Sequence, residues 1–250
     1  MKGDANASRF LYLPDPHGVF VDDAAFECAL RFGHRHRPDL VVCGGDFVDF
    51  YQLSSFDKDP QRLLDLQADC DAAAHLLHKV RRSFKHAVIY FLVGNHEDRL
   101  RRFLWKHAPA LKSLRSLELP RLLKLGENNI IYQPHGTIKI RKLLFKHGNL
   151  VRRGAGATAR AELDAEGISG VSGHTHRIGS ASKTNRGGRY TWLESGCLCK
   201  LTPEYMPGQV PDWQQGLSYG FFTAGDRFSI STAHIIGGKT MYGDHVISAA

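Results

Sequence analysis

The feature that most constrains the fold of this chain is a series of short apolar runs that alternate with segments of helical periodicity. The apolar runs are Phe10–Leu13, Leu40–Cys43 and Val88–Val93, and the segments between them are Asp22–Arg35 and Gln61–Phe84. Runs this short and this apolar are typical of strands buried on both faces. Their alternation with amphipathic helices predicts parallel strands that are joined by crossover helices.

The rhythm changes after Asn129, where short apolar segments follow one another closely. We expect further helices at Asp98–Lys106 and Ala155–Glu166, and further strands at Ile130–Gln133, Thr137–Ile140, Leu143–Lys146, Ile168–Val171, Arg189–Glu194, Tyr219–Ala224 and Phe228–Ile236. This pattern favours a second, more antiparallel sheet, with Thr202–Gly216 as a long surface loop. No linker, repeat or low-complexity tract divides the sequence. We therefore predict one domain over residues 1–250, built from two packed sheets.

Composition narrows the class of protein. The chain has 250 residues, of which 42% are hydrophobic, and this is enough for a substantial buried core. No run approaches the roughly 18 apolar residues of a membrane span, and residues 1–10 lack the apolar stretch of a signal peptide. The five cysteines are odd in number and have no CxxC spacing. They indicate reduced thiols, and we predict a cytoplasmic protein without membrane attachment.

Residue types that bind metal ions gather where the apolar runs stop. Five expected strands end in such residues, which together offer two Asp, one Asn and four His. The candidate ligands are Asp15, His17, Asp46, Asn95, His147, His174 and His176. Ligand sites assemble at the carboxyl ends of strands in open α/β sheets. A mixed set of oxygen and imidazole ligands suits Mn, Fe or Zn better than it suits a thiolate-selective metal.

In chain order these residues form five blocks, namely DxH from Asp15, GDxxD at Gly45–Asp49, GNHE at Gly94–Glu97, a lone His147 and GHxH at Gly173–His176. The blocks resemble the motifs of the calcineurin-like metallophosphoesterases and cover about two thirds of the chain. This resemblance implies a four-layer α/β/β/α sandwich of two mixed β-sheets flanked by helices. It implies that one metal is held by Asp15, His17 and His176, and a second by Asn95, His147 and His174. Asp46 would bridge the two ions.

The same resemblance implies catalytic roles for two further residues. His96 occupies the position of the imidazole that protonates the leaving-group oxygen or contacts the phosphate. Asp49 occupies the position of the carboxylate that orients this imidazole. Two metals about 3.5–4 Å apart would activate water and neutralise phosphoryl charge. Hydrolysis would proceed by in-line attack of metal-bound hydroxide on phosphorus. We expect two divalent ions, manganese first, with iron, zinc or nickel as alternatives.

Charge distribution suggests a substrate. The chain carries a formal charge of +8. Segment 79–125 has 12 Lys/Arg against three acids, and segment 141–160 has six Lys/Arg and no acid. Such a field attracts polyanions, and the aromatic rings of Phe103, Trp105, Trp192 and Trp213 are candidate surfaces for stacking bases. We therefore expect a phosphodiesterase or nuclease that acts on nucleic acid. The alternative is that these cations lie on a solvated surface and bind no partner.

Other functions remain open at this point. In the protein Ser/Thr phosphatases of this superfamily, GDxxD is followed by Arg-Gly, whereas Asp49 is followed by Phe50 and Tyr51. This departure counts against a protein phosphatase unless another arginine binds the phosphate; the candidates are Arg99, Arg152, Arg153 and Arg177. A small-nucleotide phosphohydrolase is a second alternative. A non-catalytic metal-bound scaffold is a third, and the presence of His96 with a full ligand set argues against it.

The pair Cys197 and Cys199 has a CxC spacing that is poor for structural zinc. We expect these thiols to pack in the core, with a place at the rim of the metal site as the alternative. The sequence leaves the oligomeric state open.

Overall fold

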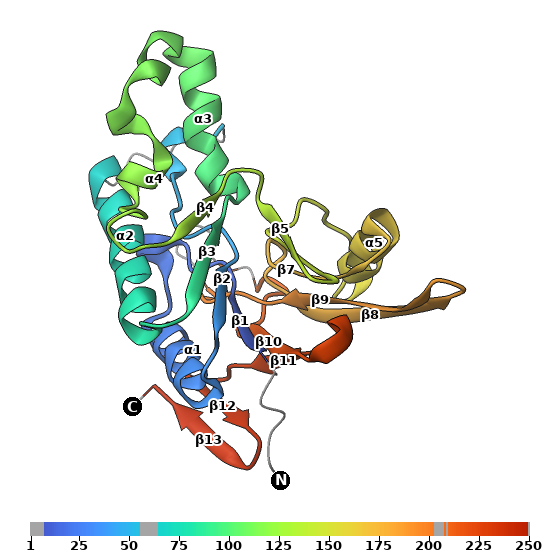
Figure 1. Cartoon of the computed structure of the whole chain (residues 1–250). Coiled ribbons are helices and arrows are strands. Elements are labelled where there is room, and N and C mark those ends of the chain that lie inside the picture. The colour runs from blue at the N-terminus through green and yellow to red at the C-terminus, as the bar shows by residue number, and fades with distance from the viewer. Residues whose placement is uncertain (1–7, 56–64, 203–207, 209, 250) are drawn as a thin grey trace.

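Two β-sheets pack face to face and carry helices on their outer faces (Figure 1). The computed structural model describes residues 8–55, 65–202, 208 and 210–249. Its layers run helix, sheet, sheet, helix, so the predicted α/β/β/α sandwich is confirmed. The strand order is β11-β10-β1-β2-β3-β4 in the first sheet and β5-β6-β7-β9-β8 in the second.

The first sheet contains the three short apolar runs of the first half of the chain and three later strands. Its strands are β1 (Ser8–Leu13), β2 (Leu40–Cys43), β3 (Val88–Leu92), β4 (Ile131–Gln133), β10 (Gly216–Phe222) and β11 (Phe228–His234). The first four are parallel to one another, whereas β10 pairs antiparallel with β1 and β11 antiparallel with β10. All four residues of β2 are buried, which explains why this run shows no polar alternation.

Helices α1 (Asp23–His36) and α2 (Leu66–Ser83) cover the outer face of the first sheet (Figure 1). The side chains of Asp22 and Asp65 cap them by accepting hydrogen bonds from the backbone N–H groups of Ala25 and Gln67, at 2.9 Å each. Their apolar faces pack on alternate residues of the strands, including Leu11 and Val41. The expected start of the second helix, residues 61–64, lies outside the described residues.

The second sheet contains β5 (Thr137–Ile140), β6 (Leu143–Lys146), β7 (Ser169–Ser172), β8 (Ile178–Asn185) and β9 (Gly188–Ser195). Helix α5 (Ala157–Glu166) covers its outer face, where Leu163 packs in one cluster with Trp192. Between the sheets, Phe10 and Phe145 meet edge to face with ring centroids 5.1 Å apart. The hydroxyl of Tyr12 donates to the Lys146 carbonyl at 2.9 Å, which joins the two sheets beside the strand ends.

A helical lobe of residues 95–122 projects beyond the first sheet, at the top of Figure 1. It begins with α3 (Asn95–His107), continues through the 3-10 turns η4 (Pro109–Ser113) and η5 (Arg115–Leu117), and ends with α4 (Leu119–Leu122). Within the described residues, three other 3-10 turns are η1 (Gly18–Phe20), η2 (Tyr51–Leu53) and η6 (Ala224–Asp226).

The structure corrects several sequence-based boundaries. Helix α3 begins at Asn95, three residues before the expected Asp98, because the buried Glu97 carboxylate accepts from the backbone N–H of Gly94 and closes the first turn. Strand β4 joins the first sheet, parallel to β3. The antiparallel character expected of the second half holds for β5–β6 and β8–β9, whereas β6–β7 and β7–β9 are parallel.

Three strands were not expected at all. The edge strand β8 is rich in small and polar residues, and the hairpin of β12 (Lys239–Tyr242) and β13 (His245–Ser248) forms a separate two-stranded sheet. Residues 203–207 and 209 of the expected loop Thr202–Gly216 lie outside the described residues. No helix within the described ranges has the length and apolar character needed to cross a membrane.

Candidate metal centre

The carboxyl ends of five strands, three from the first sheet and two from the second, meet at one edge of the sandwich. The segment after β1 supplies Asp15 and His17, that after β2 supplies Asp46, and α3, which follows β3, begins with Asn95. From the second sheet, β6 leads to His147 and β7 leads to His174 and His176. Contacts between these side chains, given below, show that the structure brings all seven predicted ligands into one cluster.

Five of these seven residues adopt left-handed backbone conformations. Their φ angles are 41° at Asp15, 53° at His17, 51° at Asp46, 70° at His174 and 57° at His176. Residues other than glycine rarely adopt such angles, and each costs free energy that the surrounding fold must offset. The strained turns aim side chains from adjacent positions into the same space, and such clustering of strain is typical of functional sites.

Asp15, His17 and His176 form the first group. His17 Nδ1 lies 3.3 Å from Asp49 Oδ1, so its proton points at that carboxylate and the Nε2 lone pair faces the cluster. Nε2 of His17 is 3.0 Å from Nε2 of His176, and Nε2 of His176 is 3.8 Å from Asp15 Oδ1. These two nitrogens lie at hydrogen-bond distance, and both of their lone pairs face the same point when each ring carries its proton on Nδ1, as a pair of metal ligands requires. The donor set therefore fits a metal ion.

Asn95, His147 and His174 form the second group, next to Asp46, and the ring centroids of His147 and His174 are 5.1 Å apart. The Asn95 Oδ1 atom lies 2.9 Å from His147 Nε2, and Asp46 Oδ2 lies 3.4 Å from the same nitrogen. His147 Nδ1 donates to the Gly44 carbonyl at 2.9 Å, which fixes the tautomer and leaves Nε2 free as a ligand. Asp46 Oδ2 is also 3.8 Å from His17 Nε2, so Asp46 lies between the two groups, where a bridging ligand is required.

The electrostatics of the cluster favour a bound cation. Burial lowers the pKa of His147, but the charges of Asp46 and Asp15 outweigh it and raise this pKa to about 10. Burial and the neighbouring His147 lower the pKa of His174 to about 4, which leaves its imidazole neutral with a lone pair to donate. The buried carboxylates thus stabilise a proton on His147, and bound divalent ions would supply this positive charge in its place.

His96 and Asp49 lie beside the cluster in the arrangement expected of an oriented imidazole. His96 Nδ1 is 3.0 Å from Asp49 Oδ1 and 2.8 Å from the Asp49 carbonyl, while Nε2 is 3.9 Å from Asp46 Oδ2. Burial lowers the pKa of His96, but Asp46 and Asp49 outweigh burial and raise it. Because Asp49 also contacts His17, this one carboxylate supports both a candidate ligand and the candidate acid.

Among the four candidate arginines, Arg99 is the one that contacts this pair. Its Nη2 donates to His96 Nε2 at 3.0 Å and its Nη1 donates to the Asp49 carbonyl at 2.7 Å. Arg177 is held by Asp212 at 3.2 Å and donates to the Arg152 carbonyl. The side chains of Arg152 and Arg153 are exposed. The roles of these arginines remain predictions.

Sequence reasoning missed the supporting role of Glu97. This buried carboxylate accepts from the backbone N–H groups of Asp46, Phe47, Val48 and Gly94, at 2.9, 2.8, 3.3 and 2.8 Å. It therefore holds the turn that carries Asp46 against the turn that carries Asn95. The signal was present in the GNHE block, because an acid three residues after a helix N-cap closes a capping box.

Asp69 plays a similar part for the next turn. The side chain of this α2 residue is buried and accepts from the backbone N–H groups of Asp49 and Phe50, at 3.3 and 2.7 Å. Nothing in its sequence surroundings marks this role. It fixes the backbone that presents the Asp49 carboxylate to His96.

All five cysteines are free and buried, and one of them reaches the metal cluster. Cys199 Sγ lies 3.9 Å from His176 Nδ1, and with His17 and His176 it forms a group of possible ligand atoms. Cys199 thus lies at the rim of the site, whereas Cys197 Sγ contacts the Gln214 carbonyl at 3.7 Å. A hydrogen bond with Cys197 and burial raise the pKa of Cys199, so it is a thiol at neutral pH. Trp213 packs edge to face against His176, with ring centroids 4.4 Å apart.

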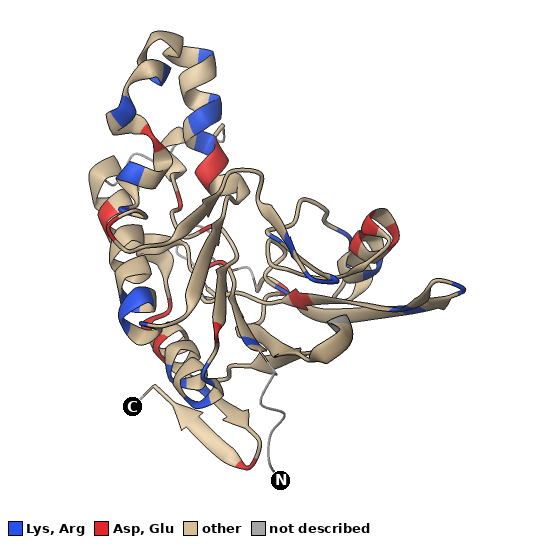
Figure 2. Ribbon diagram, viewed as in Figure 1, with Lys and Arg blue, Asp and Glu red and all other residues tan. Residues whose placement is uncertain are grey.

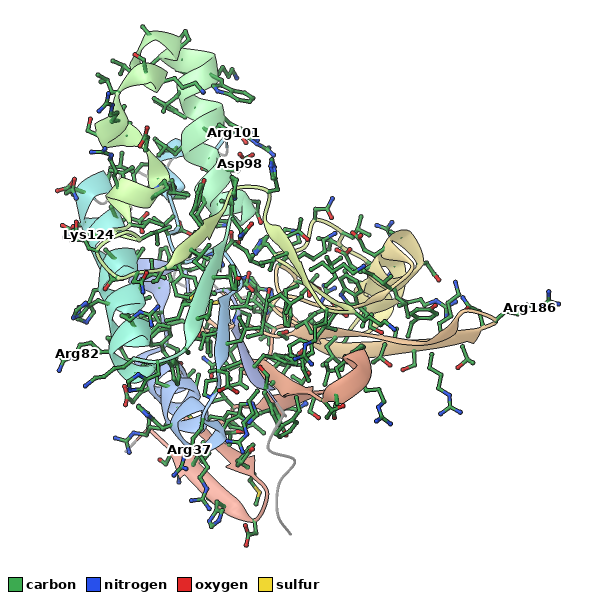
Figure 3. The ribbon with its side chains drawn as sticks, in the orientation of Figure 1. Arg37, Arg82, Asp98, Arg101, Lys124 and Arg186 are labelled. Atoms are coloured by element: carbon green, nitrogen blue, oxygen red, sulfur yellow. The ribbon has the colours of Figure 1, made fainter. Side chains whose placement is uncertain are left out.

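Figure 2 marks the positions of Lys and Arg along the ribbon. Many cations of the basic segments are already paired. Arg101 and Arg102 both bind Asp98 on α3, and Lys146 binds two glutamates on α5 at 2.9 Å each. Arg81 donates to the carbonyls of Asn128 and Asn129 at 2.8 and 2.7 Å, so it is a structural residue. Others extend from the surface, such as Arg82 and Lys124 in Figure 3.

Three solved structures illustrate what the chain is similar to. Vacuolar protein sorting 29 from Cryptosporidium parvum is 14% identical, with 98% of this chain and 100% of that one covered and a TM-score of 0.48. Zinc-complexed Vps29 from Entamoeba histolytica is 14% identical over 97% and 99% of the chains, with a TM-score of 0.43. Yfce, a phosphoesterase from E. coli, is 14% identical over 90% and 97%, with a TM-score of 0.38. With TM-scores this low, these likenesses carry no functional argument.

The sequence itself decides the family. A comparison with curated proteins gives no match. The family model for calcineurin-like phosphoesterases matches residues 8–178, which span β1 to the start of β8 and include every candidate ligand. The chain therefore belongs to the calcineurin-like phosphoesterase family.

Proposed function

We propose that this protein is a dinuclear metal-dependent hydrolase of phosphoesters. The observation that carries the proposal is the position of His96, which lies beside the candidate metal cluster and is hydrogen-bonded to Asp49 through Nδ1. A protein that only binds metal has no need of an imidazole oriented in this way. The same observation supports a hydrolase over a non-catalytic metal-bound scaffold.

Two divalent ions, manganese first, would neutralise charge on the phosphoryl oxygens and make a water molecule nucleophilic at neutral pH. The protein supplies the rest of the chemistry. Asp49 fixes the His96 ring and stabilises its protonated form, so that Nε2 can protonate the leaving-group oxygen. Arg99, which donates to His96 Nε2 at 3.0 Å without substrate, is placed to turn its guanidinium to a phosphate oxygen.

For the substrate, we propose the phosphodiesters of nucleic acid. The net charge of +8 supports this assignment, as do the exposed basic residues that form no ion pair with a described residue, among them Arg82, Lys106 and Arg115. Such residues would bind backbone phosphates in a salt-dependent manner. A small-nucleotide phosphohydrolase is the second candidate, because the pairing of Arg101 and Arg102 with Asp98 weakens the basic field near the site. The reduced state of the cysteines fits activity in the cytoplasm.

The test is cleavage of end-labelled single- and double-stranded DNA by Mn²⁺-loaded protein, with the His96→Ala variant as a control for contaminating nuclease. Cleavage of the labelled DNA by the wild-type protein, without cleavage by the variant, supports a nuclease. If the DNA stays intact while the same protein hydrolyses a chromogenic phosphoester, the hydrolase assignment stands and DNA is excluded as the substrate. No turnover of any phosphoester with several metals refutes the enzyme assignment and leaves the scaffold.

A further inference from the structure

A large cavity opens directly beside the candidate metal centre. Its volume is about 1030 Å³, at the upper end of the range of about 300–1,000 Å³ for ligand pockets. Asn95 and His147, two candidate ligands of the second metal, form part of its lining. A phosphoester bound at the metals would therefore extend its organic group into this space.

The cavity lies between the helical lobe and the second sheet, and much of its wall is apolar. Helix α3 contributes Leu100 and Leu104 from one face, the lobe adds Leu117, and β6 adds Leu144 from the opposite side. Leu100, Leu104 and Leu144 are largely buried, with exposed fractions of 7%, 7% and 9%. Walls of this kind hold a group with apolar faces and exclude water from it.

The charges of the lining do not favour a second phosphate. The wall carries three Lys/Arg and four Asp/Glu, so it has no cationic excess. Arg101 is bound by Asp98, the two labelled neighbours on α3 in Figure 3, and Lys146 is bound by Glu166 at 2.9 Å. A stretch of phosphate backbone would meet four acids and two paired cations here, and Lys112 is the one lining cation that forms no ion pair with a described residue, whereas an uncharged group would not be repelled.

The wall also offers polar groups that form no hydrogen bond or ion pair with a described residue. Among the described residues, neither the Tyr132 hydroxyl nor the His135 ring has a hydrogen-bond partner, and Lys112 forms no ion pair. A pocket for an alkyl chain gains nothing from such groups. Apolar walls with a few free donors and acceptors suit a flat ring that has hydrogen-bonding edges, as a nucleobase has.

We propose that this cavity binds the nucleoside attached to the phosphate undergoing hydrolysis. The proposal rests on the proposed phosphoesterase function and names the group that the site recognises. The base would lie between the leucines of the lobe and Leu144, with Tyr132 facing its polar edge. The rest of a nucleic-acid substrate would lie outside the cavity, where the unpaired cations are.

The test compares three diesters that share the p-nitrophenolate leaving group, so that differences in kcat/KM report on the second ester group. The esters are methyl, decyl and thymidine-5′ p-nitrophenyl phosphate, each offered to the Mn²⁺-loaded full chain. We expect kcat/KM for the thymidine ester to exceed that for the methyl ester by about tenfold or more. A decyl ester that equals or exceeds the thymidine ester would overturn the proposal in favour of a lipid-like substrate.

Two leucines of the same lobe provide a matched pair of variants. Leu117 lines the cavity, whereas Leu114 is 47% exposed and does not. Leu117→Glu places a charge in the wall and should reduce the thymidine-to-methyl ratio about tenfold, while Leu114→Glu should keep the wild-type ratio. Tyr132→Phe, which preserves the packing, should reduce the ratio by about two- to tenfold. An unchanged ratio in both Leu117→Glu and Tyr132→Phe overturns the proposal.

A binding measurement separates failure of the cavity from failure of catalysis. Saturation-transfer NMR with thymidine needs no turnover, and we expect a signal from wild type and Leu114→Glu that Leu117→Glu loses. If no ester is hydrolysed but thymidine binds in this pattern, the hydrolase assignment fails and the nucleoside site stands. If the methyl ester is hydrolysed and thymidine neither binds nor improves turnover, the nucleoside site alone fails.

Discussion

Glu97 gives the sharpest test of how the metal centre is held in place. Its Oε1 accepts from the N–H groups of Phe47 and Val48, and its Oε2 accepts from those of Asp46 and Gly94. A buried donor without an acceptor costs about 1–3 kcal/mol. Glu97→Gln turns an amide NH₂ toward two of these donors, so we expect a loss of at least about 2 kcal/mol in the free energy of unfolding. Glu97→Ala leaves all four donors unpaired and should lose at least about 4 kcal/mol.

The assay is urea denaturation of EDTA-treated protein followed by circular dichroism, which removes any contribution from bound metal. Glu118→Gln is the matched control, because Glu118 is exposed and its carboxylate binds, among the described residues, only Arg121, at 3.4 Å. This variant should change the free energy of unfolding by less than about 0.5 kcal/mol. The reasoning is refuted if Glu97→Gln unfolds with the free energy of wild type. A second consequence is weaker Mn²⁺ binding, because the turn that carries Asp46 loses its support.

Three further predictions follow from the contacts of single residues. Asp46→Asn should weaken the binding of both metal ions together. Titration calorimetry that finds the affinity of one site unchanged would contradict the assignment of Asp46 as the bridging ligand. His96→Ala should retain the metal content and lower kcat about 10²–10⁴-fold. Asp49→Asn should lower both turnover and metal affinity, because Asp49 contacts His17 as well as His96. Mass-spectrometric metal analysis together with kinetics distinguishes the two variants. Arg81→Ala should lower the free energy of unfolding by about 2–3 kcal/mol because its charged hydrogen bonds to carbonyls are lost, and Arg82→Ala should change it by less than about 0.5 kcal/mol; equal melting curves for the two variants would contradict this difference.

The central strands were predictable because their environment leaves a clear trace in the sequence. Strands β1, β2 and β3 are covered by helices on one side and by the second sheet on the other, so nearly every position is apolar. Strand β8 is the opposite case. It lies at the edge of its sheet, and all of its residues are at least partly exposed. Its small and polar side chains show neither the two-residue alternation of a strand nor the 3.6-residue repeat of a helix.

The clustering of the candidate ligands was predictable because parallel strands end at a common edge, and because the glycines beside them mark close approaches of the backbone. Gly94 shows the physical need, since a Cβ there would lie 2.1 Å from Asp46 Oδ1. Residues that act through the tertiary fold were not predictable. Asp69 lies 20 residues from Asp49, and Arg81 lies 47 residues from Asn128, so no local pattern connects either pair.

The most direct test of the account is anomalous X-ray diffraction from crystals soaked in Mn²⁺, which locates each ion without reference to activity. We predict two manganese peaks per chain, one beside Asp15, His17 and His176 and one beside Asn95, His147 and His174, with Asp46 between them. A single peak, or a peak at a site away from these side chains, would contradict the dinuclear centre on which the proposed chemistry depends.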